Sequence, residues 1–168
     1  AFVARNHYAN FPLTANALFS VFSSAYDPIL RHPFEEGKIK NSETLTLVVK
    51  NYPEIAIKML PETLKEKGYR TLYFHTWTLG YVGTRRFLQK RKFDVMLDMH
   101  QLKLSSPYNQ TLGYGIDDRA LIEESIRALN ADRTKPFFAV YCPLSPHFPI
   151  RYPMKNSTLR DRHRKMPL

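Results

Sequence analysis

The stretch "PETLKEKGYRTLYFH", residues 61–75, contains a helix pattern followed directly by a strand pattern, and it decides the fold class. Pro61 suits the first turn of a helix, where a missing N–H is not needed, and Gly68 suits the position just after a helix end. The β-branched and aromatic run YRTLYFH then predicts a strand that ends at His75. A helix leading tightly into an apolar strand is typical of α/β proteins.

The same alternation continues along the chain. The segment RRFLQKRKFDVMLD predicts a short basic helix that runs into a strand near residues 94–97. The segment KPFFAVYC, residues 135–142, predicts a buried strand that enters the proline-rich loop PLSPHFPI. Together these elements predict an α/β domain with a mostly parallel sheet.

A longer helix is predicted between these two strands. Asp117 or Asp118 can cap its start, because a carboxylate there accepts hydrogen bonds from free backbone N–H groups. Both aspartates are therefore interpreted as caps and not as metal ligands. The predicted buried face consists of Leu121, Ile122, Ile126 and Leu129.

Composition limits the class of protein. A chain of 168 residues with 43% hydrophobic residues is long enough for one domain with a real core. Its net charge of +10 favours anionic partners such as phosphate or sulfate esters, acidic lipid headgroups or nucleic acid. Part of this charge lies in a basic run near the end, and we expect residues from about 156 onward to pack poorly. The single Cys142 excludes an internal disulfide framework and a thiolate zinc cluster.

Residues 8–26 carry no charge, but their serines, asparagines, threonine and proline argue against a membrane-spanning helix. Pro12 instead favours a helix start, which places Thr14 in the first turn beside unpaired backbone N–H groups. Thr14 is then either a cap or a nucleophile, and a threonine nucleophile needs a base or a metal for activation. The predicted buried face of this helix consists of Ala17, Leu18, Val21 and Phe22.

Two histidines, His75 and His147, fall at or just beyond the carboxyl ends of predicted strands. Ligands bind at that edge of α/β sheets, so this placement predicts a site there.

The order of these segments resembles the sulfatase-type catalytic domain of the alkaline phosphatase superfamily. It resembles most the branch that includes lipoteichoic acid synthase and phosphoglycerol transferases. The specific parts are GYRTLYFH and PLSPHFPI, and the likeness runs from about residue 6 to 153. The resemblance implies an alkaline phosphatase-like three-layer α/β/α sandwich, incomplete here. Residues 1–168 would form a single catalytic domain truncated at both ends.

The resemblance also implies roles for particular residues. Thr14 matches the family's nucleophile, which also coordinates a divalent metal, Mn²⁺ first and Mg²⁺, Zn²⁺ or Ca²⁺ as alternatives. His75 and His147 match histidines that bind the substrate, and either Arg85 or Arg86 matches an arginine that holds its phosphate. The remaining metal ligands, an acidic residue and an Asp-His pair, are expected outside this chain, before its start and after its end.

The implied function is metal-dependent transfer or hydrolysis of phosphate-type esters, with lipid or cell-envelope headgroups as substrates. Sulfate esters are less favoured, because neither Thr14 nor Cys142 lies in a C/S-x-P-x-R motif. The full-length protein would be membrane-anchored, with this domain on the periplasmic or extracellular side.

The alternative is a basic module that binds nucleic acid or an anionic membrane surface without catalysis. Its support is the net charge alone, because the sequence lacks a glycine-rich phosphate loop and helix-turn-helix spacing. A nucleic-acid partner is therefore not expected.

Overall fold

A computed structural model of the protein describes residues 14–26, 54–145 and 147. The described residues form two compact units. The first contains residues 14–26, 54–71 and 79–94, and the second contains residues 72–78, 95–145 and 147. Pro12 and the basic run near the end lie outside the described residues, so the predictions made for them remain predictions.

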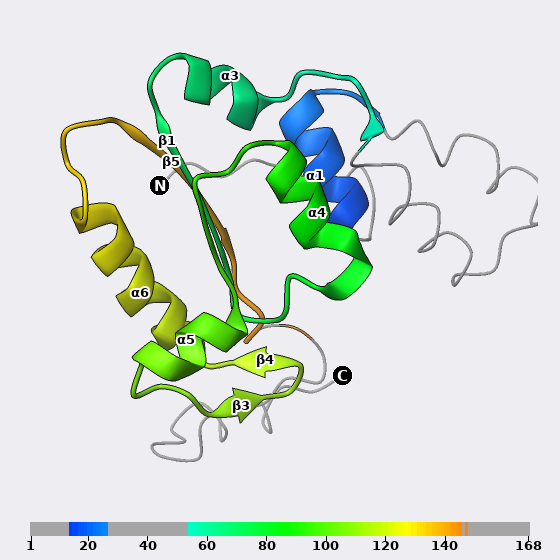
Figure 1. Ribbon diagram of the computed structural model, residues 1–168. Helices are drawn as coiled ribbons and strands as arrows, with labels where there is room; N and C mark the ends of the chain where they lie inside the picture. Colours follow the sequence, from blue (N-terminus) through cyan, green and yellow to red (C-terminus); the bar gives the residue numbers. More distant parts are fainter. Residues whose placement is uncertain (1–13, 27–53, 146, 148–168) are drawn as a thin grey trace, which may run out of the picture. The chain divides into compact units, whose positions relative to one another are not determined.

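The first unit is helical. It contains α1 (Thr14–Ser23), α3 (Leu60–Glu66), the 3₁₀ turn η2 (Tyr81–Gly83) and α4 (Thr84–Lys90), as Figure 1 shows for the labelled helices. The start of α3 agrees with the prediction, with Pro61 in its first turn and the Met59 N–H 3.0 Å from the Glu62 carboxylate. Gly68 follows its end with a φ of +84°, where a glycine is favoured.

The predicted buried face of α1 was right for Phe22 and wrong for Val21. Val21 is 65% exposed, whereas the buried residues of the helix are Asn16, Phe19, Ser20 and Phe22. The ring of Phe22 stacks on Phe87 of α4, with centroids 6.3 Å apart, and also approaches the ring of Phe93. The contacts of the large aromatic side chains therefore decide which face of α1 is buried, and Val21 is left on the exposed face.

A buried arginine ties the segment before α3 to the end of α4. The Arg91 guanidinium donates to the backbone carbonyls of Ile55 and Ile57, both at 2.8 Å, and to the Glu62 carboxylate at 3.2 Å. Arg91 is only 4% exposed, so these polar partners replace water around its charge.

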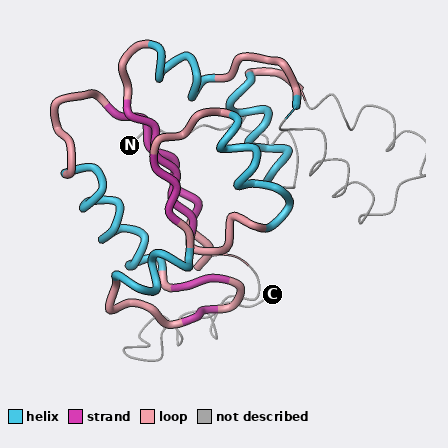
Figure 2. The backbone as a smooth tube through the Cα atoms, in the orientation of Figure 1, coloured by secondary structure: helices cyan, strands magenta, loops and turns pink. Residues whose placement is uncertain are grey.

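The second unit contains the sheet, with strand order β2-β1-β5. β1 (Arg70–His75) belongs to this unit from Leu72 on, and it pairs in parallel with β2 (Val95–Leu97), Leu72 lying opposite Val95. β1 is buried on both faces, which explains why its sequence shows no alternation of apolar and polar residues. Figure 2 shows the strands side by side in magenta.

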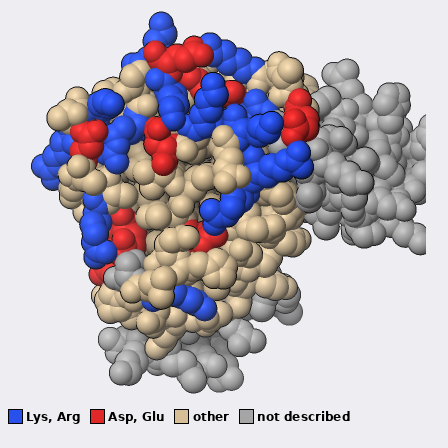
Figure 3. All heavy atoms as spheres, in the orientation of Figure 1, with Lys and Arg blue, Asp and Glu red and all other residues tan. Residues whose placement is uncertain are grey.

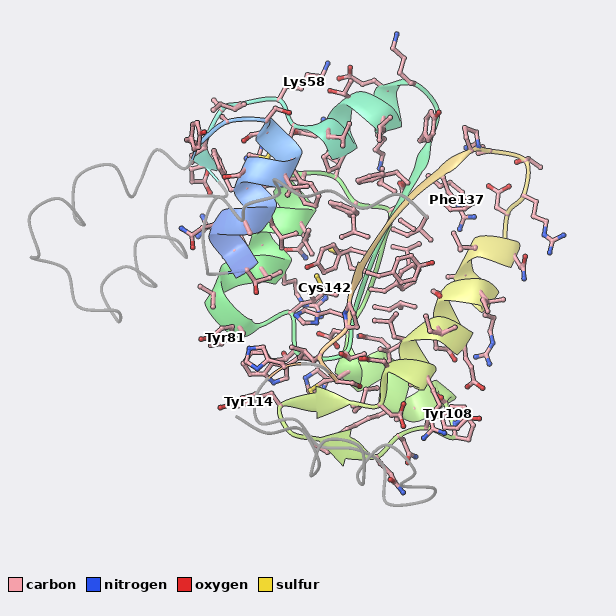
Figure 4. All side chains as sticks on the ribbon, turned by 180° about the vertical axis from the view of Figure 1, so that it is seen from behind. Lys58, Tyr81, Tyr108, Tyr114, Phe137 and Cys142 are labelled. Atoms are coloured by element: carbon pink, nitrogen blue, oxygen red, sulfur yellow. The ribbon has the colours of Figure 1, made fainter. Side chains whose placement is uncertain are left out.

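The prediction of a buried strand at 135–142 was right about the strand and wrong about its burial. β5 (Phe137–Cys142) lies at the edge of the described sheet, and Phe137 is 53% exposed. Tyr141 is 40% exposed. Figure 4 shows Phe137 and Cys142 at opposite ends of this strand. An apolar run alone does not tell a central strand from an edge strand.

Two helices and a hairpin complete the second unit: α5 (Met99–Ser105), β3 (Thr111–Leu112), β4 (Gly115–Ile116) and α6 (Asp118–Asn130). Its core contains Leu72, Phe74, Leu102, Ile116, Ala120 and Leu121. The predicted buried face of α6 was therefore right for Leu121. It was wrong for Ile122 and Ile126, which are 51% and 54% exposed.

The α/β class with a mostly parallel sheet is confirmed, and the described sheet is partial. Within the described residues, no helix is both long and apolar enough to cross a membrane.

Candidate active site at the carboxyl edge of the sheet

Three chain segments of the second unit meet at the carboxyl edge of the sheet. His75 is the last residue of β1, Asp98 directly follows β2, and Cys142 is the last residue of β5. The Nδ1 atom of His75 lies 3.1 Å from the Cys142 carbonyl oxygen, so β1 and β5 end at the same edge. This is the edge at which α/β sheets bind ligands.

His75 is held as a neutral imidazole in one orientation. Burial lowers its pKa, while the Cys142 carbonyl and the charge of Asp98 act in the opposite direction. Donation from Nδ1–H to the Cys142 carbonyl leaves Nε2 as the acceptor nitrogen. The Trp77 N–H also lies 3.3 Å from Nδ1, but a protonated Nδ1 cannot accept from it. We therefore assign the shorter contact, to the Cys142 carbonyl, as the hydrogen bond donated by Nδ1–H.

The sequence reasoning missed Asp98. This carboxylate is fully buried and caps α5, accepting from the His100 N–H at 3.0 Å. The Asp98 N–H in turn donates to the Gln101 side chain, which completes a capping box. Its signal in the sequence is an aspartate directly after the strand VML with a glutamine three residues later. Asp98 brings a negative charge close to His75 at the sheet edge.

His147 lies beyond β5 beside an aromatic strip made of Trp77 and Tyr114. Its ring meets the Tyr114 ring edge to face, with centroids 5.6 Å apart at 88°. The Trp77 ring lies 5.7 Å from Tyr114 on the same strip. Figure 4 shows Tyr114 on the turn between β3 and β4. The strip connects His147 to the segment that follows His75.

Gly115 explains how the hairpin fits so closely. A Cβ atom at this position would lie 2.6 Å from the Thr76 carbonyl oxygen. The Ile116 N–H donates to that same oxygen at 2.8 Å. A glycine is therefore required where the hairpin touches the residue after His75.

The two predicted caps of α6 have different roles. Asp117 is the cap, accepting from the Arg119 N–H at 2.9 Å, and hydrogen bonds with Arg119 lower its pKa against the opposing effect of burial. The Asp118 carboxylate instead accepts from backbone N–H groups of Leu144 and Ser145, in the loop that leads to His147.

Cys142 has no properties of a nucleophile. Burial raises the pKa of its thiol, and its Sγ lies 3.0 Å from the Tyr73 hydroxyl. Burial likewise raises the pKa of Tyr73. Both groups therefore stay protonated at neutral pH, as expected for a structural cysteine.

The other predicted site residues lie in the first unit. Thr14 is the first residue of α1 and its side chain is exposed, as the prediction of a helix-start threonine requires. Arg85 and Arg86 both lie in the first turn of α4. Arg86 pairs with Glu54 at 2.6 Å, a hydrogen bond that lowers the pKa of the glutamate. The backbone N–H of Arg85 donates to Leu79 at 2.8 Å.

The distribution of surface charge does not show which of the two arginines would bind an anion. Figure 3 shows Lys and Arg side chains over one face of the molecule, with Asp and Glu side chains among them. Several lysines of the first unit are paired in the same way, for example Lys65 with Asp94 at 2.5 Å. That Arg85 or Arg86 holds an anion stays a prediction.

Metal-ligating side chains lie scattered over residues 14–26, 54–145 and 147. In this part of the chain, no three or more His, Cys, Asp and Glu side chains gather to hold a metal ion. The described residues alone therefore do not fit a catalytic metal, which takes at least three protein ligands.

Comparisons with known proteins bear on the family and the fold. The family model described as Sulfatase matches residues 1–163. The lipoteichoic acid synthase LtaP from Listeria monocytogenes is similar in structure, with a TM-score of 0.64 and 20% identity over 83% of this chain. An alkaline phosphatase superfamily protein from Vibrio parahaemolyticus has a TM-score of 0.58 and 18% identity over 82% of this chain. No curated protein matches the sequence.

The chain spans 30% of the length of each of these two structures. At such identities they support an alkaline phosphatase-like fold, and the family follows from the sequence match that covers almost the whole chain. The chain belongs to the sulfatase family.

Proposed function

We propose that this chain supplies the nucleophile and the anion-binding side chains of a domain that transfers or hydrolyses phosphate-type esters. Membership of the sulfatase family supports transfer or hydrolysis of phosphate or sulfate esters in general. The observation that carries the finer proposal is that His75 ends β1 and His147 follows β5 within one compact unit. Polar side chains at that edge suit an anionic ligand.

Phosphate is the favoured group and sulfate the less favoured one. The C/S-x-P-x-R motif of the sulfate-cleaving branch is absent from the sequence. The one cysteine, Cys142, is a protonated thiol at a strand end. The resemblance to the phosphate-transferring branch implies a threonine nucleophile instead, and Thr14 is the residue that matches it.

In the proposed reaction, Thr14 Oγ1 loses its proton and forms a bond to phosphorus as the bond from phosphorus to the leaving oxygen breaks. The leaving oxygen takes up a proton and departs as an alcohol. Water or an acceptor hydroxyl then attacks the phosphorylated threonine, which releases the product and restores the hydroxyl. Either Arg85 or Arg86 binds the anionic oxygens, a task that suits a guanidinium group. His147 contacts the transferred group, and neutral His75 offers Nε2 as a hydrogen-bond acceptor for a substrate hydroxyl.

The superfamily generally depends on a divalent metal, and Mn²⁺ is the ion we propose. A threonine hydroxyl is a weak nucleophile without such help. Because the described residues lack a cluster of three ligands, we propose that most ligands come from other parts of the protein. The likeness to a lipoteichoic acid synthase suggests a lipid or cell-envelope headgroup as the substrate. It also suggests that the full-length protein is membrane-anchored.

Turnover of a phosphodiester by the full-length protein tests this proposal. Thr14→Ala should lower kcat by at least about 10³-fold while the fold stays intact, because the covalent route is lost. Thr84→Ala is the matched control, since Thr84 also opens a helix and its hydroxyl donates to the Tyr81 carbonyl of the preceding turn. Equal turnover by the wild type and Thr14→Ala would reject the nucleophile. Absence of turnover in all three proteins, with phosphate still bound, would favour the basic binding module.

A further inference from the structure

Asp118 connects two parts of the second unit that are distant in the sequence. Its Oδ1 accepts from the Leu144 N–H at 3.0 Å, across 26 residues of chain. Its Oδ2 accepts from the Ser145 N–H at 3.2 Å, and Oδ1 lies 3.4 Å from the same N–H. One carboxylate thus binds two successive N–H groups of the loop after β5.

Capping does not explain this aspartate. Asp117 already caps α6, with its side chain bonded to the Arg119 backbone N–H and to the Arg119 guanidinium. Asp118 is the first residue of the helix, and its carboxylate is directed to the loop. Two neighbouring carboxylates therefore have separate roles, one within the helix and one toward the loop.

Leu144 connects Asp118 to His147 through two hydrogen bonds of its backbone. The Leu144 carbonyl accepts from the His147 N–H at 2.8 Å, while the Leu144 N–H is held by Asp118. On its other side, the His147 ring packs against Tyr114 of the β3–β4 turn. His147 is thus fixed by two hydrogen bonds in series from Asp118 and by one aromatic neighbour.

We propose that Asp118 is the positioning residue of His147, setting its ring for the anion without touching the substrate. This inference rests on the proposed function in one respect, the role of His147 in binding the transferred group. A carboxylate bonded to backbone N–H groups forms strong charge-assisted hydrogen bonds, so it can fix a loop that otherwise lacks regular structure. At metal sites, loss of a group that orients a ligating side chain typically costs about 10–100-fold in affinity or activity, and we expect an effect of similar size for the orientation of His147.

The test measures the affinity of the full-length protein for inorganic phosphate by calorimetry. Asp118→Ala should weaken binding at least about tenfold. Asp118→Asn should weaken it less, because the amide oxygen can still accept from one N–H group. Asp132→Ala is the matched control, because the Asp132 carboxylate also accepts a backbone N–H, from Thr134, which lies two residues further along the chain. The control should bind phosphate like the wild type.

A double-mutant cycle separates positioning from a general structural role. In a His147→Ala background, Asp118→Ala should cause no further loss of phosphate affinity, because the residue it acts through is gone. Equal losses in both backgrounds would overturn the proposal. If Asp118→Ala does not fold by circular dichroism, the same cycle is run with Asp118→Asn.

An NMR measurement keeps the proposal independent of the anion-binding role. Asp118→Ala should shift the His147 and Tyr114 ring signals and weaken the nuclear Overhauser effect between the two rings, whereas Asp132→Ala should not. Unchanged ring signals in Asp118→Ala would overturn the proposal. If His147→Ala binds phosphate normally while the ring signals respond to Asp118, the proposed function of His147 fails and its positioning by Asp118 stands.

Discussion

At the scale of single residues, polar groups at the sheet edge are arranged by burial and by backbone partners. The buried His75 ring forms a hydrogen bond with the Cys142 carbonyl, and Asp98 is fully buried at the start of α5. Buried polar groups of this kind remain in a fold when their hydrogen bonds are satisfied, and they often mark functional sites.

Burial of His75 makes the stability of the protein depend on pH. Its pKa lies below the 6.5 of an ordinary histidine, so the unfolded chain binds this proton more readily than the folded protein does. The free energy of unfolding should therefore fall as the pH drops below about 6.5, by at most about 1.4 kcal/mol per pH unit. Urea denaturation at pH 7.5 and pH 5.5 measures this fall.

His75→Asn should remove that pH dependence, because an amide does not titrate but can still donate to the Cys142 carbonyl. His100→Gln is the control, since His100 is exposed and should leave the dependence unchanged. The lowered pKa of Asp117 acts only near and below its ordinary value of 3.8, outside this pH range. A pH dependence that persists in His75→Asn would contradict the assignment.

Among the secondary structure elements, local sequence patterns predicted where helices and strands lie, but they did not predict which helix faces are buried. The start and end of α3 and the strand β1 follow from Pro61, Gly68 and an apolar run, which act within a few residues. The buried faces of α1 and α6 were partly wrong, because which face is buried depends on the neighbours each helix meets. Phe22 meets Phe87, and this contact is not encoded locally.

The elements that the sequence did not predict are short. Helix α5 has 7 residues, and β3 and β4 have 2 residues each, so their periodicity is too brief to recognise. Only the aspartate and glutamine of the α5 capping box could have shown that helix. At the site, the positions of Thr14, His75 and His147 in their elements were predictable, whereas the Asp118 contact spans 26 residues and was not.

The fit of the hairpin against Thr76 can be tested with two glycine substitutions. Gly115→Ala should destabilise the protein by about 1–3 kcal/mol, because the new methyl group meets a backbone carbonyl that cannot move aside easily. Gly68→Ala should cost only about 1 kcal/mol, since Gly68 has a positive φ but open space around it. Urea denaturation of both variants gives the comparison. A smaller effect at Gly115 than at Gly68 would show that the close approach to Thr76 is tolerated.

At the scale of the whole molecule, this chain corresponds to 30% of the length of each structure it resembles. It belongs to a family of ester-transferring and ester-cleaving domains, yet its described residues lack a three-ligand metal cluster. The proposed nucleophile and the anion-binding residues are thus present, and we propose that the rest of the metal site comes from elsewhere in the protein.

Metal dependence should therefore differ between two forms of the protein. The 168-residue chain should bind phosphate but hydrolyse a phosphodiester negligibly, with or without Mn²⁺, because fewer than three ligands rarely hold a catalytic ion. The full-length protein should gain activity when Mn²⁺ is added and lose it when a chelator removes the metal. Turnover of the 168-residue chain that Mn²⁺ stimulates would show that this chain holds its own metal site.

The central claim is that Thr14 carries the transferred group during the reaction. The most direct measurement is mass spectrometry of the full-length protein, stopped with acid during phosphodiester turnover and digested into peptides. We predict a mass increase equal to the transferred phosphoryl-type group on the peptide that contains Thr14, and no such increase in Thr14→Ala. An adduct on any other residue, or steady turnover by Thr14→Ala at the wild-type rate, would contradict the account.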